Sequence, residues 1–209
     1  MFFNCLGIAR CQTADERYEA LLERCVERSH RNVESGIECL ENLLRSHPDK
    51  GFVHLFLARN YRQSKSLDRA EKSADLFLSS YPTHASGYEV KCQILADREK
   101  YPDALKACAR AAEIEPDKID YRRDYASVIE KSGDSRQAET LYKQILTKNP
   151  DHQLTLVSLG RLYETTGRTD QAIETYEKLL ELDFEFKDKL LEGIKKLKEK
   201  QKDEPQGKN

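Results

Sequence analysis

Four prolines recur at a constant interval, and this interval constrains the fold more than any other feature of the chain. Pro48, Pro82, Pro116 and Pro150 stand 34 residues apart. Two series of small residues share the interval: Ala70, Ala104, Ala138 and Ala172, and Ala58, Cys92, Ala126 and Gly160. Self-similarity at a fixed period of this size is the signature of a repeat architecture. The chain is therefore predicted to consist of stacked units of one kind.

Each repeat contains two helical patterns. In residues 153–186, one apolar stripe at helical spacing comprises Leu156, Leu159, Gly160 and Tyr163, and a second comprises Ala172, Ile173, Tyr176, Leu179 and Leu180. Gly133 and Gly167 separate the patterns where a helix needs a left-handed residue to end. The proline then ends the second helix. We predict an all-α fold of antiparallel helix pairs, whose small residues allow close approach.

Composition limits the classes of partner. The chain is 34% charged and 38% hydrophobic, and its formal net charge is −2, with 35 basic and 37 acidic residues. This balance gives no field that would gather nucleic acid or an anionic membrane. No apolar run approaches the ~20 residues of a membrane-spanning helix. Residues 1–14 lack the basic lead of a secretory signal, so we expect an apolar segment packed on the first helices.

The six cysteines form no pair at the two-residue gap of zinc or redox motifs, so no structural metal is predicted. Four of them lie among apolar residues at helical spacing: Cys25, Cys39, Cys92 and Cys108. A thiol in such a place behaves as a small hydrophobe. We expect these cysteines to be reduced and packed in the core, which is compatible with a cytoplasmic protein.

These residues resemble the tetratricopeptide repeat family. The family pattern of a bulky residue, Leu-Gly and Tyr on the first helix, with Ala and an aromatic on the second, is met by Leu156, Leu159, Gly160, Tyr163, Ala172 and Tyr176, although Phe184 replaces the proline. The resemblance implies a right-handed α-solenoid of about five repeats: 15–50, 51–84, 85–118, 119–152 and 153–186. It also implies that protein segments bind along a concave face lined by the first helices.

The two ends depart from the pattern. In the divergent repeat 15–50 the apolar stripe lies two residues early, so we expect a loop about two residues longer around 29–32. After residue 186, one further apolar stripe comprises Leu190, Leu191, Ile194 and Leu197. We predict that residues 187–200 form a capping helix over the last repeat. Residues 201–209 are predicted to be a disordered tail.

The resemblance also indicates which residues face the groove. The candidates are Phe52, Leu55, Phe56, Arg59, Arg62, Gln63, Glu89, Gln93, Arg123, Ser127 and Arg161. Repeat 51–84 alone combines apolar anchors with cations, and aromatic rings rimmed by Arg are typical of binding hot spots. This predicts a protein or peptide partner with acidic and apolar residues. The alternative, that Phe52 and Phe56 are covered by the first repeat and the N-terminal segment, stays open.

Other functional classes lack support. No nucleophile with its base, metal set or phosphate-binding loop is present, so the chain is predicted to be non-enzymatic and without a cofactor. The residues at the positions of a chaperone-tail clamp, including Glu89, Gln93 and Asp124, do not fit one. We therefore expect a scaffold or adaptor of a co-chaperone-like kind. An RNA-binding helical repeat, a regulatory subunit of an enzyme complex and self-association remain alternatives.

Overall fold

The computed structural model describes residues 13–182 and 185–203. This part of the chain contains eleven α-helices and no strand, so the prediction of an all-α fold is confirmed. The chain divides into two compact units, Met1–Pro82 (unit 1) and Thr83–Asn209 (unit 2). Each unit is described by itself.

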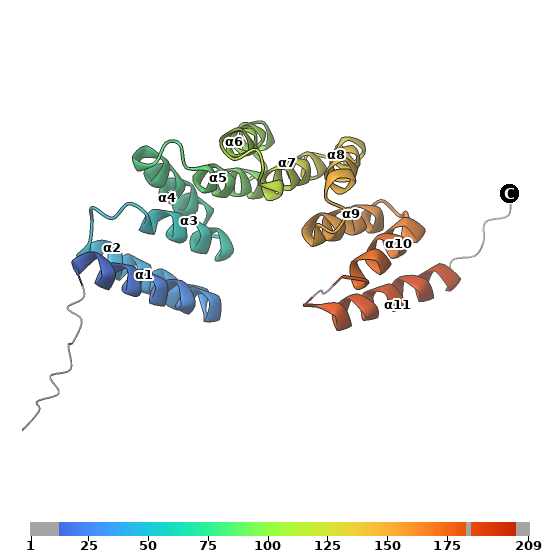
Figure 1. Ribbon diagram of the computed structural model, residues 1–209, viewed down its shortest axis with the longest axis horizontal. Coiled ribbons are helices and arrows are strands. Elements are labelled where there is room, and N and C mark those ends of the chain that lie inside the picture. The colour runs from blue at the N-terminus through green and yellow to red at the C-terminus, as the bar shows by residue number, and fades with distance from the viewer. Residues whose placement is uncertain (1–12, 183–184, 204–209) are drawn as a thin grey trace, which may run out of the picture. The chain divides into compact units, whose positions relative to one another are not determined.

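Unit 1 consists of two helix pairs (Figure 1). Its helices are α1 (Ala14–Arg31), α2 (Val33–Ser46), α3 (Val53–Gln63) and α4 (Leu67–Ser80). Helix α1 packs on α2, α3 packs on α4, and α2 joins the two pairs through α3. Helix α1 begins with a capping box, in which the Thr13 side chain accepts from the Glu16 amide while the Glu16 side chain accepts from the Thr13 amide.

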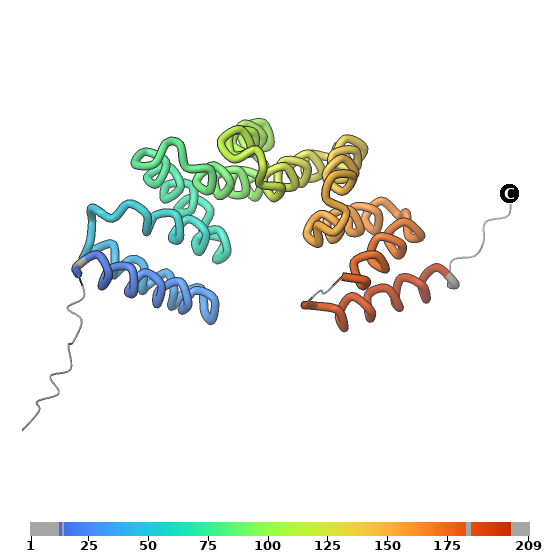
Figure 2. The backbone as a smooth tube through the Cα atoms, viewed as in Figure 1, coloured from blue at the N-terminus to red at the C-terminus, as the bar shows by residue number. Residues whose placement is uncertain are grey.

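Unit 2 continues the alternation through six helices and adds a seventh. The helices are α5 (Ala85–Asp97), α6 (Tyr101–Ile114), α7 (Ile119–Lys131), α8 (Ser135–Lys148), α9 (Gln153–Thr165), α10 (Thr169–Leu180) and α11 (Lys187–Asp203). Figure 2 follows the backbone through these successive hairpins, and α11 packs along α10. Helix α11 extends three residues beyond the predicted end at residue 200. Residues 1–12, residues 183–184 with Phe184, and residues 204–209 lie outside the described residues.

The turns within the helix pairs repeat at the same interval as the prolines. A residue with positive φ occupies each turn from α3/α4 to α9/α10: Lys65 (62°), Glu99 (60°), Gly133 (101°) and Gly167 (73°). Each turn has a backbone hydrogen bond of the Schellman type, such as that from the Ser66 amide to the Tyr61 carbonyl at 2.8 Å. The predicted roles of the two glycines are confirmed, whereas Lys65 and Glu99 adopt the same conformation without glycine.

One contact between paired helices recurs with different chemistry. In α9/α10, a Cβ added to Gly160 would collide with the Tyr176 ring. The corresponding positions in α7/α8 hold Ala126 and Tyr142, which are buried in the same core cluster. The small first-helix residue therefore leaves room for the aromatic ring of the second helix.

The expectation of reduced cysteines is wrong. Disulfides join Cys25 to Cys39 across α1/α2 and Cys92 to Cys108 across α5/α6. The paired Cα atoms lie 5.3 and 5.2 Å apart, within the range that a disulfide spans. Close helix packing had been expected to bury these thiols, and it also places their sulfur atoms opposite one another.

The predicted longer loop in the first repeat is also wrong. Helix α1 continues to Arg31, and Asn32 alone separates it from α2. The Asn32 amide donates to the Arg28 carbonyl at 2.8 Å, and its side chain accepts from the Ser35 amide at 2.7 Å. The additional residues therefore lengthen the helix, because one Asn both ends α1 and begins α2.

Candidate protein-binding faces

The aromatic residues predicted to face a groove in repeat 51–84 lie at the start of α3. The Phe52 ring contacts Phe77 and Tyr81 of the same helix pair, with centroids 5.4 and 5.7 Å apart. Its centroid lies 6.0 Å from that of Phe56, and both Phe52 and Phe56 are half-buried. Phe52 therefore packs against its own helix pair. The alternative from the sequence was that the first repeat covers it.

The other predicted residues of α3 differ in exposure. Leu55 is only 3% exposed and belongs to the core, so it offers no surface to a ligand. Arg59 and Gln63 are exposed, and Arg62 is half-buried. Since Phe56, Arg59 and Gln63 recur at intervals of three and four residues, they share one face of the helix.

Several predicted groove residues of unit 2 pair with carboxylates of the same face. Arg123 of α7 lies 2.7 Å from Asp124 and 3.3 Å from Asp120. Gln93 of α5 donates to Asp124 at 2.8 Å. Asp124 is 7% exposed, so this carboxylate joins α5 to α7 from within the packed face.

The remaining candidates in unit 2 follow the same trend. Arg161 of α9 lies 3.6 Å from Glu130 of α7. Lys131 of α7, which is not one of the candidates, lies 3.0 Å from Asp97 of α5. Glu89 and Ser127 are half-buried. The first helices of unit 2 thus present a polar face whose cations are matched by its own carboxylates.

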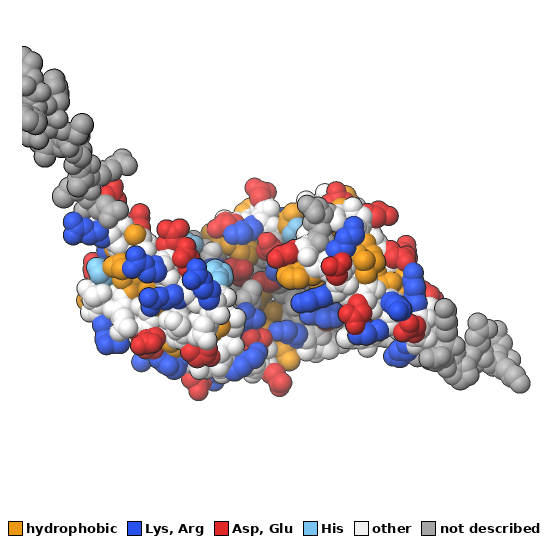
Figure 3. Space-filling model, turned by 90° about the horizontal axis from the view of Figure 1, so that it is seen from below, with side chains coloured by type: hydrophobic (Ala, Val, Ile, Leu, Met, Phe, Trp, Pro, Cys, Tyr) orange, Lys and Arg blue, Asp and Glu red, His pale blue; other side chains and the backbone are white. Residues whose placement is uncertain are grey.

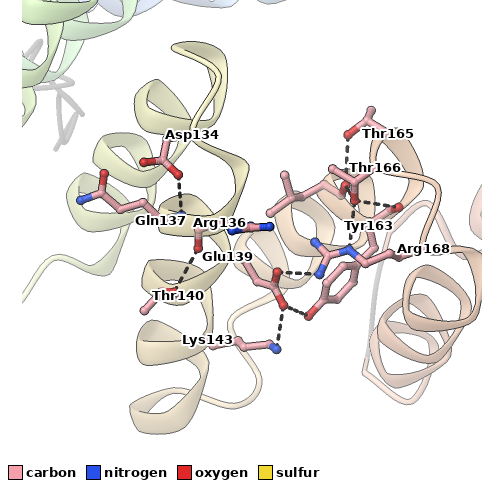
Figure 4. A network of polar contacts seen from close by, with 11 residues as sticks. Asp134, Arg136, Gln137, Glu139, Thr140, Lys143, Tyr163, Thr165, Thr166 and Arg168 are labelled. Atoms are coloured by element: carbon pink, nitrogen blue, oxygen red, sulfur yellow. Dashed lines mark hydrogen bonds and ion pairs between the residues drawn. The ribbon is translucent and has the colours of Figure 1, made fainter.

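A half-buried carboxylate cluster, not predicted from the sequence, joins successive helix pairs (Figure 4). Glu139 of α8 accepts from Arg168 at 2.6 Å and from Tyr163 at 3.0 Å, and it lies 2.8 Å from Lys143. Burial alone would raise the pKa of Glu139, but these three donors and the Arg168 charge outweigh burial and lower it to about 2. In Figure 4 the side chains converge from α8, α9 and the following turn.

Unit 1 contains a similar cluster. Glu41 of α2 accepts from Tyr61 of α3 at 2.5 Å and also from Arg69 of α4. The Tyr61 hydrogen bond and the Arg69 guanidinium lower the pKa of Glu41, against the effect of burial. The Arg69 guanidinium also lies 4.1 Å from the Tyr61 ring centroid. Both clusters fix one helix pair to the next, so their role is structural.

Another polar contact missed by the sequence analysis lies inside unit 1. Asn60 of α3 is buried and donates to the Ser29 hydroxyl at 2.6 Å, and Ser29 donates to the Cys25 carbonyl at 3.0 Å. Gly36 of α2 permits this approach, because an added Cβ would collide with Ser29. Asn60 interrupts the apolar stripe of α3, and this polar residue was the sequence signal for a buried hydrogen bond.

Two cavities bear on binding. A cavity of about 680 Å³ lies between α6, α7 and α8, and its lining includes Ala112, Ile119, Tyr125, Leu141 and Ile145. A smaller one of about 290 Å³ lies between α1 and α2. In residues 13–182 and 185–203, no group of three or more His, Cys, Asp or Glu side chains could hold a metal. No helix within those ranges is long and apolar enough to cross a membrane.

Comparison with known proteins identifies the fold. Residues 130–188 match the tetratricopeptide repeat family model. A thermophilic TPR protein of Thermus thermophilus superposes with a TM-score of 0.75 at 21% identity, over 86% of this chain and 98% of that one. The pilF protein of Pseudomonas aeruginosa superposes with a TM-score of 0.67 at 18% identity, over 90% and 86%.

A curated relative is much longer than this chain. The auxiliary subunit NAA15 of the N-terminal acetyltransferase A complex of Arabidopsis thaliana is 22% identical over 183 residues, which make up 83% of this chain and 20% of that protein. The likenesses to solved structures show the fold alone. Residues 130–188 therefore resemble tetratricopeptide repeats, and the chain shares the fold of these solved structures.

Proposed function

We propose that the chain is a non-enzymatic scaffold that binds a peptide segment of a partner protein on the exposed face of α3. The observation that carries this proposal is the position of Phe56. Its ring is half-buried on a helix whose other apolar residues, such as Leu55 and Leu57, are in the core. Exposed Arg59 lies one turn further along the same face. A ring beside a guanidinium suits an apolar peptide that carries carboxylates.

On the face of α5, α7 and α9, cations and carboxylates of the chain pair with one another. A ligand there would have to displace ion pairs such as Arg123–Asp124 and Lys131–Asp97. Leaving a buried carboxylate such as Asp124 without its partner costs more than an exposed pair contributes. We therefore expect the unit 2 face to be a weaker site for an acidic peptide.

Two substitutions with matched controls test the proposal. Phe56→Ala should reduce retention of crosslinked partners from the native cell, by about 2 kcal/mol or more in affinity. Arg59→Glu should do the same without lowering the melting temperature. The controls are Leu76→Ala and Lys72→Glu, at exposed positions of α4. Lost stability in Phe56→Ala, with retention unchanged in Arg59→Glu, would assign Phe56 to packing and contradict the proposal.

A second candidate function is that of an auxiliary subunit in an enzyme complex. The similarity to the NAA15 auxiliary subunit favours it, although this chain spans a fifth of that protein's length. Copurification of a transferase with the tagged chain, at constant stoichiometry over gel filtration, would support this function. A chain that elutes without any enzyme under crosslinking would contradict it.

A cytoplasmic location stays a proposal, and the disulfides oppose it. Cys25–Cys39 and Cys92–Cys108 are bonded, whereas reducing compartments keep structural disulfides rare. Thiol alkylation of the chain in intact cells decides the question. Alkylation of all four cysteines before reduction would support the cytoplasm, and protection of both pairs would oppose it.

A further inference from the structure

Helix α1 carries its basic and acidic side chains on opposite edges. Its basic edge follows intervals of four and three residues through Arg17, Leu21, Arg24, Arg28 and Arg31. Its acidic edge comprises Glu16, Glu19, Glu23 and Glu27. With 3.6 residues per turn, each set forms a narrow line along the helix. The basic edge lies beside α2, and Leu21 interrupts its charge with an apolar side chain.

The basic edge borders the cavity of about 290 Å³, here named the α1/α2 groove. Each helix contributes four residues at the spacing i, i+3, i+4 and i+7: Leu21, Arg24, Cys25 and Arg28 from α1, and Cys39, Asn42, Leu43 and Ser46 from α2. Leu21, which is 39% exposed, and the half-buried Cys39 form its accessible apolar part, whereas Cys25 and Leu43 are buried. Two parallel stripes at this spacing form a seat for a third helix.

The arginines of this edge are available to a ligand. Among the described residues, Arg17, Arg24, Arg28 and Arg31 enter no ion pair and no side-chain hydrogen bond, whereas Arg69 is held by Glu41. Figure 3 shows Lys and Arg side chains around hydrophobic side chains on this part of unit 1. The surface therefore combines an apolar centre with unmatched positive charge.

We propose that the α1/α2 groove binds an acidic amphipathic helix of a partner protein. The apolar face of such a helix would cover Leu21 and the half-buried Cys39. Its flanking carboxylates would pair with Arg24 and Arg28, and guanidinium groups bind carboxylates in a bidentate manner. The inference shares with the proposed function the premise that the chain binds proteins, but it uses a different helix pair.

Charge argues against other occupants of the groove. Residues 1–12 are apolar but contain no Asp or Glu, so they cannot neutralise the arginines. The acidic edge of α1, with Glu19 and Glu23, would repel an extended polyanion such as nucleic acid or an anionic membrane. A partner with few carboxylates on one helix face avoids that repulsion.

The test uses the full chain and three synthetic helices of the same length as α1, 18 residues. The first has leucines at i, i+3, i+4 and i+7 spacing flanked by glutamates. The second replaces the glutamates with lysines, and the third replaces the leucines with serines. Fluorescence anisotropy should show binding of the first peptide at least ten-fold tighter than of either other peptide, and binding should weaken as salt is added.

Variants locate the site. Arg24→Glu with Arg28→Glu, and separately Leu21→Asp, should each weaken the first peptide at least ten-fold, while Glu19→Lys with Glu23→Lys should not weaken it. Phe56→Ala should leave this peptide bound, so failure here is distinguishable from failure of the α3 proposal. Equal affinity for all three peptides would overturn the inference. Light scattering that shows a dimer of the parent chain, and monomers of the arginine variants, would also overturn it. Binding of the chain to anionic vesicles, without binding to the first peptide, would do the same.

Discussion

The two end helix pairs of the chain differ in how their outer surfaces are covered. In unit 2, α11 packs on α10 and buries Ile194, with Leu190 and Leu197 partly buried beside it in the same core cluster. In unit 1, no helix of the described residues covers the α1/α2 groove, where Leu21 stays exposed. A stack of helix pairs needs a polar cover at an end that is not used for binding. Within the residues that the structure describes, the last helix pair is covered and the α1/α2 groove is open.

The charged side chains of α11 and α1 differ in the same way as the cover of the two helix pairs. The outer residues of α11 form short-range ion pairs within the helix, such as Lys196–Glu192 at 2.7 Å. The basic edge of α1 is separated from its acidic edge, so its arginines stay unmatched. Charges matched within one helix favour solubility, whereas unmatched charges beside an apolar groove favour recognition.

Removal of helix α11, which covers the last helix pair, should have the largest effect on stability. A chain that lacks residues 187–209 should lose about 5 kcal/mol in the free energy of unfolding of unit 2, because three apolar side chains lose a burial of ~1.5–3 kcal/mol each. The exposed face should also promote association. Chemical denaturation and light scattering measure both effects. A monomer with the parent's stability would show that the C-terminal pair needs no cover.

Loss of the disulfide between α1 and α2 should have the next largest effect on stability. Cys25→Ser with Cys39→Ser should lower stability by about 3 kcal/mol, as expected for a closed loop of this length. Cys92→Ser with Cys108→Ser serves as the matched pair inside unit 2. Thermal unfolding with and without reductant measures the loss. Identical melting curves for the parent in both conditions would contradict a stabilising role.

A smaller effect should appear at low pH. The folded-state pKa of Glu139 lies at about 2, below its usual 4.5. This depressed pKa stabilises the fold fully above pH 4.5, and the contribution is lost as pH falls toward 2. After allowance for solvent screening we expect a loss of about 1–2 kcal/mol. Denaturation between pH 6 and pH 2 should show it, and Glu139→Gln should flatten that dependence. A Gln variant with the parent's slope would refute this role.

The smallest effect concerns the turns. Lys65→Gly should stabilise the α3/α4 pair by about 0.5–1 kcal/mol, since a side chain at positive φ is unfavourable. Gly167→Ala should destabilise the α9/α10 pair for the same reason. Urea denaturation of both variants measures the difference. Changes of equal sign would show that the two turns are not equivalent.

The repeat architecture could be predicted because it depends on residue type at fixed intervals. The second-helix alanines, including Ala70 and Ala138, are fully buried as their interval implied. The positive φ of Lys65 and Glu99 could not be predicted from residue type, because the turn imposes it. Lys65 lies two repeats and Glu99 one repeat before Gly133, and this spacing was a signal that remained unused.

The candidate site was harder to predict than the fold. Whether Leu55 faces the core or a groove depends on the rotation of α3 about its axis, which the apolar pattern of its sequence does not determine. The neutralisation of Arg123 depends on which carboxylates adjacent helices bring within reach. The disulfides depend on the register of the two helices across a hairpin. Sequence periodicity defines helix faces, but not the contacts between neighbouring faces.

The contrast between the two ends is tested most directly by one pair of substitutions measured by equilibrium denaturation. Ile194→Asp places a charge in the contact between α10 and α11, where Ile194 is 5% exposed. Leu21→Asp places the same charge in the open α1/α2 groove. We predict a loss of about 3–5 kcal/mol for Ile194→Asp and less than about 0.5 kcal/mol for Leu21→Asp. Losses of equal size would show that the N-terminal pair is covered as well, and would contradict the account.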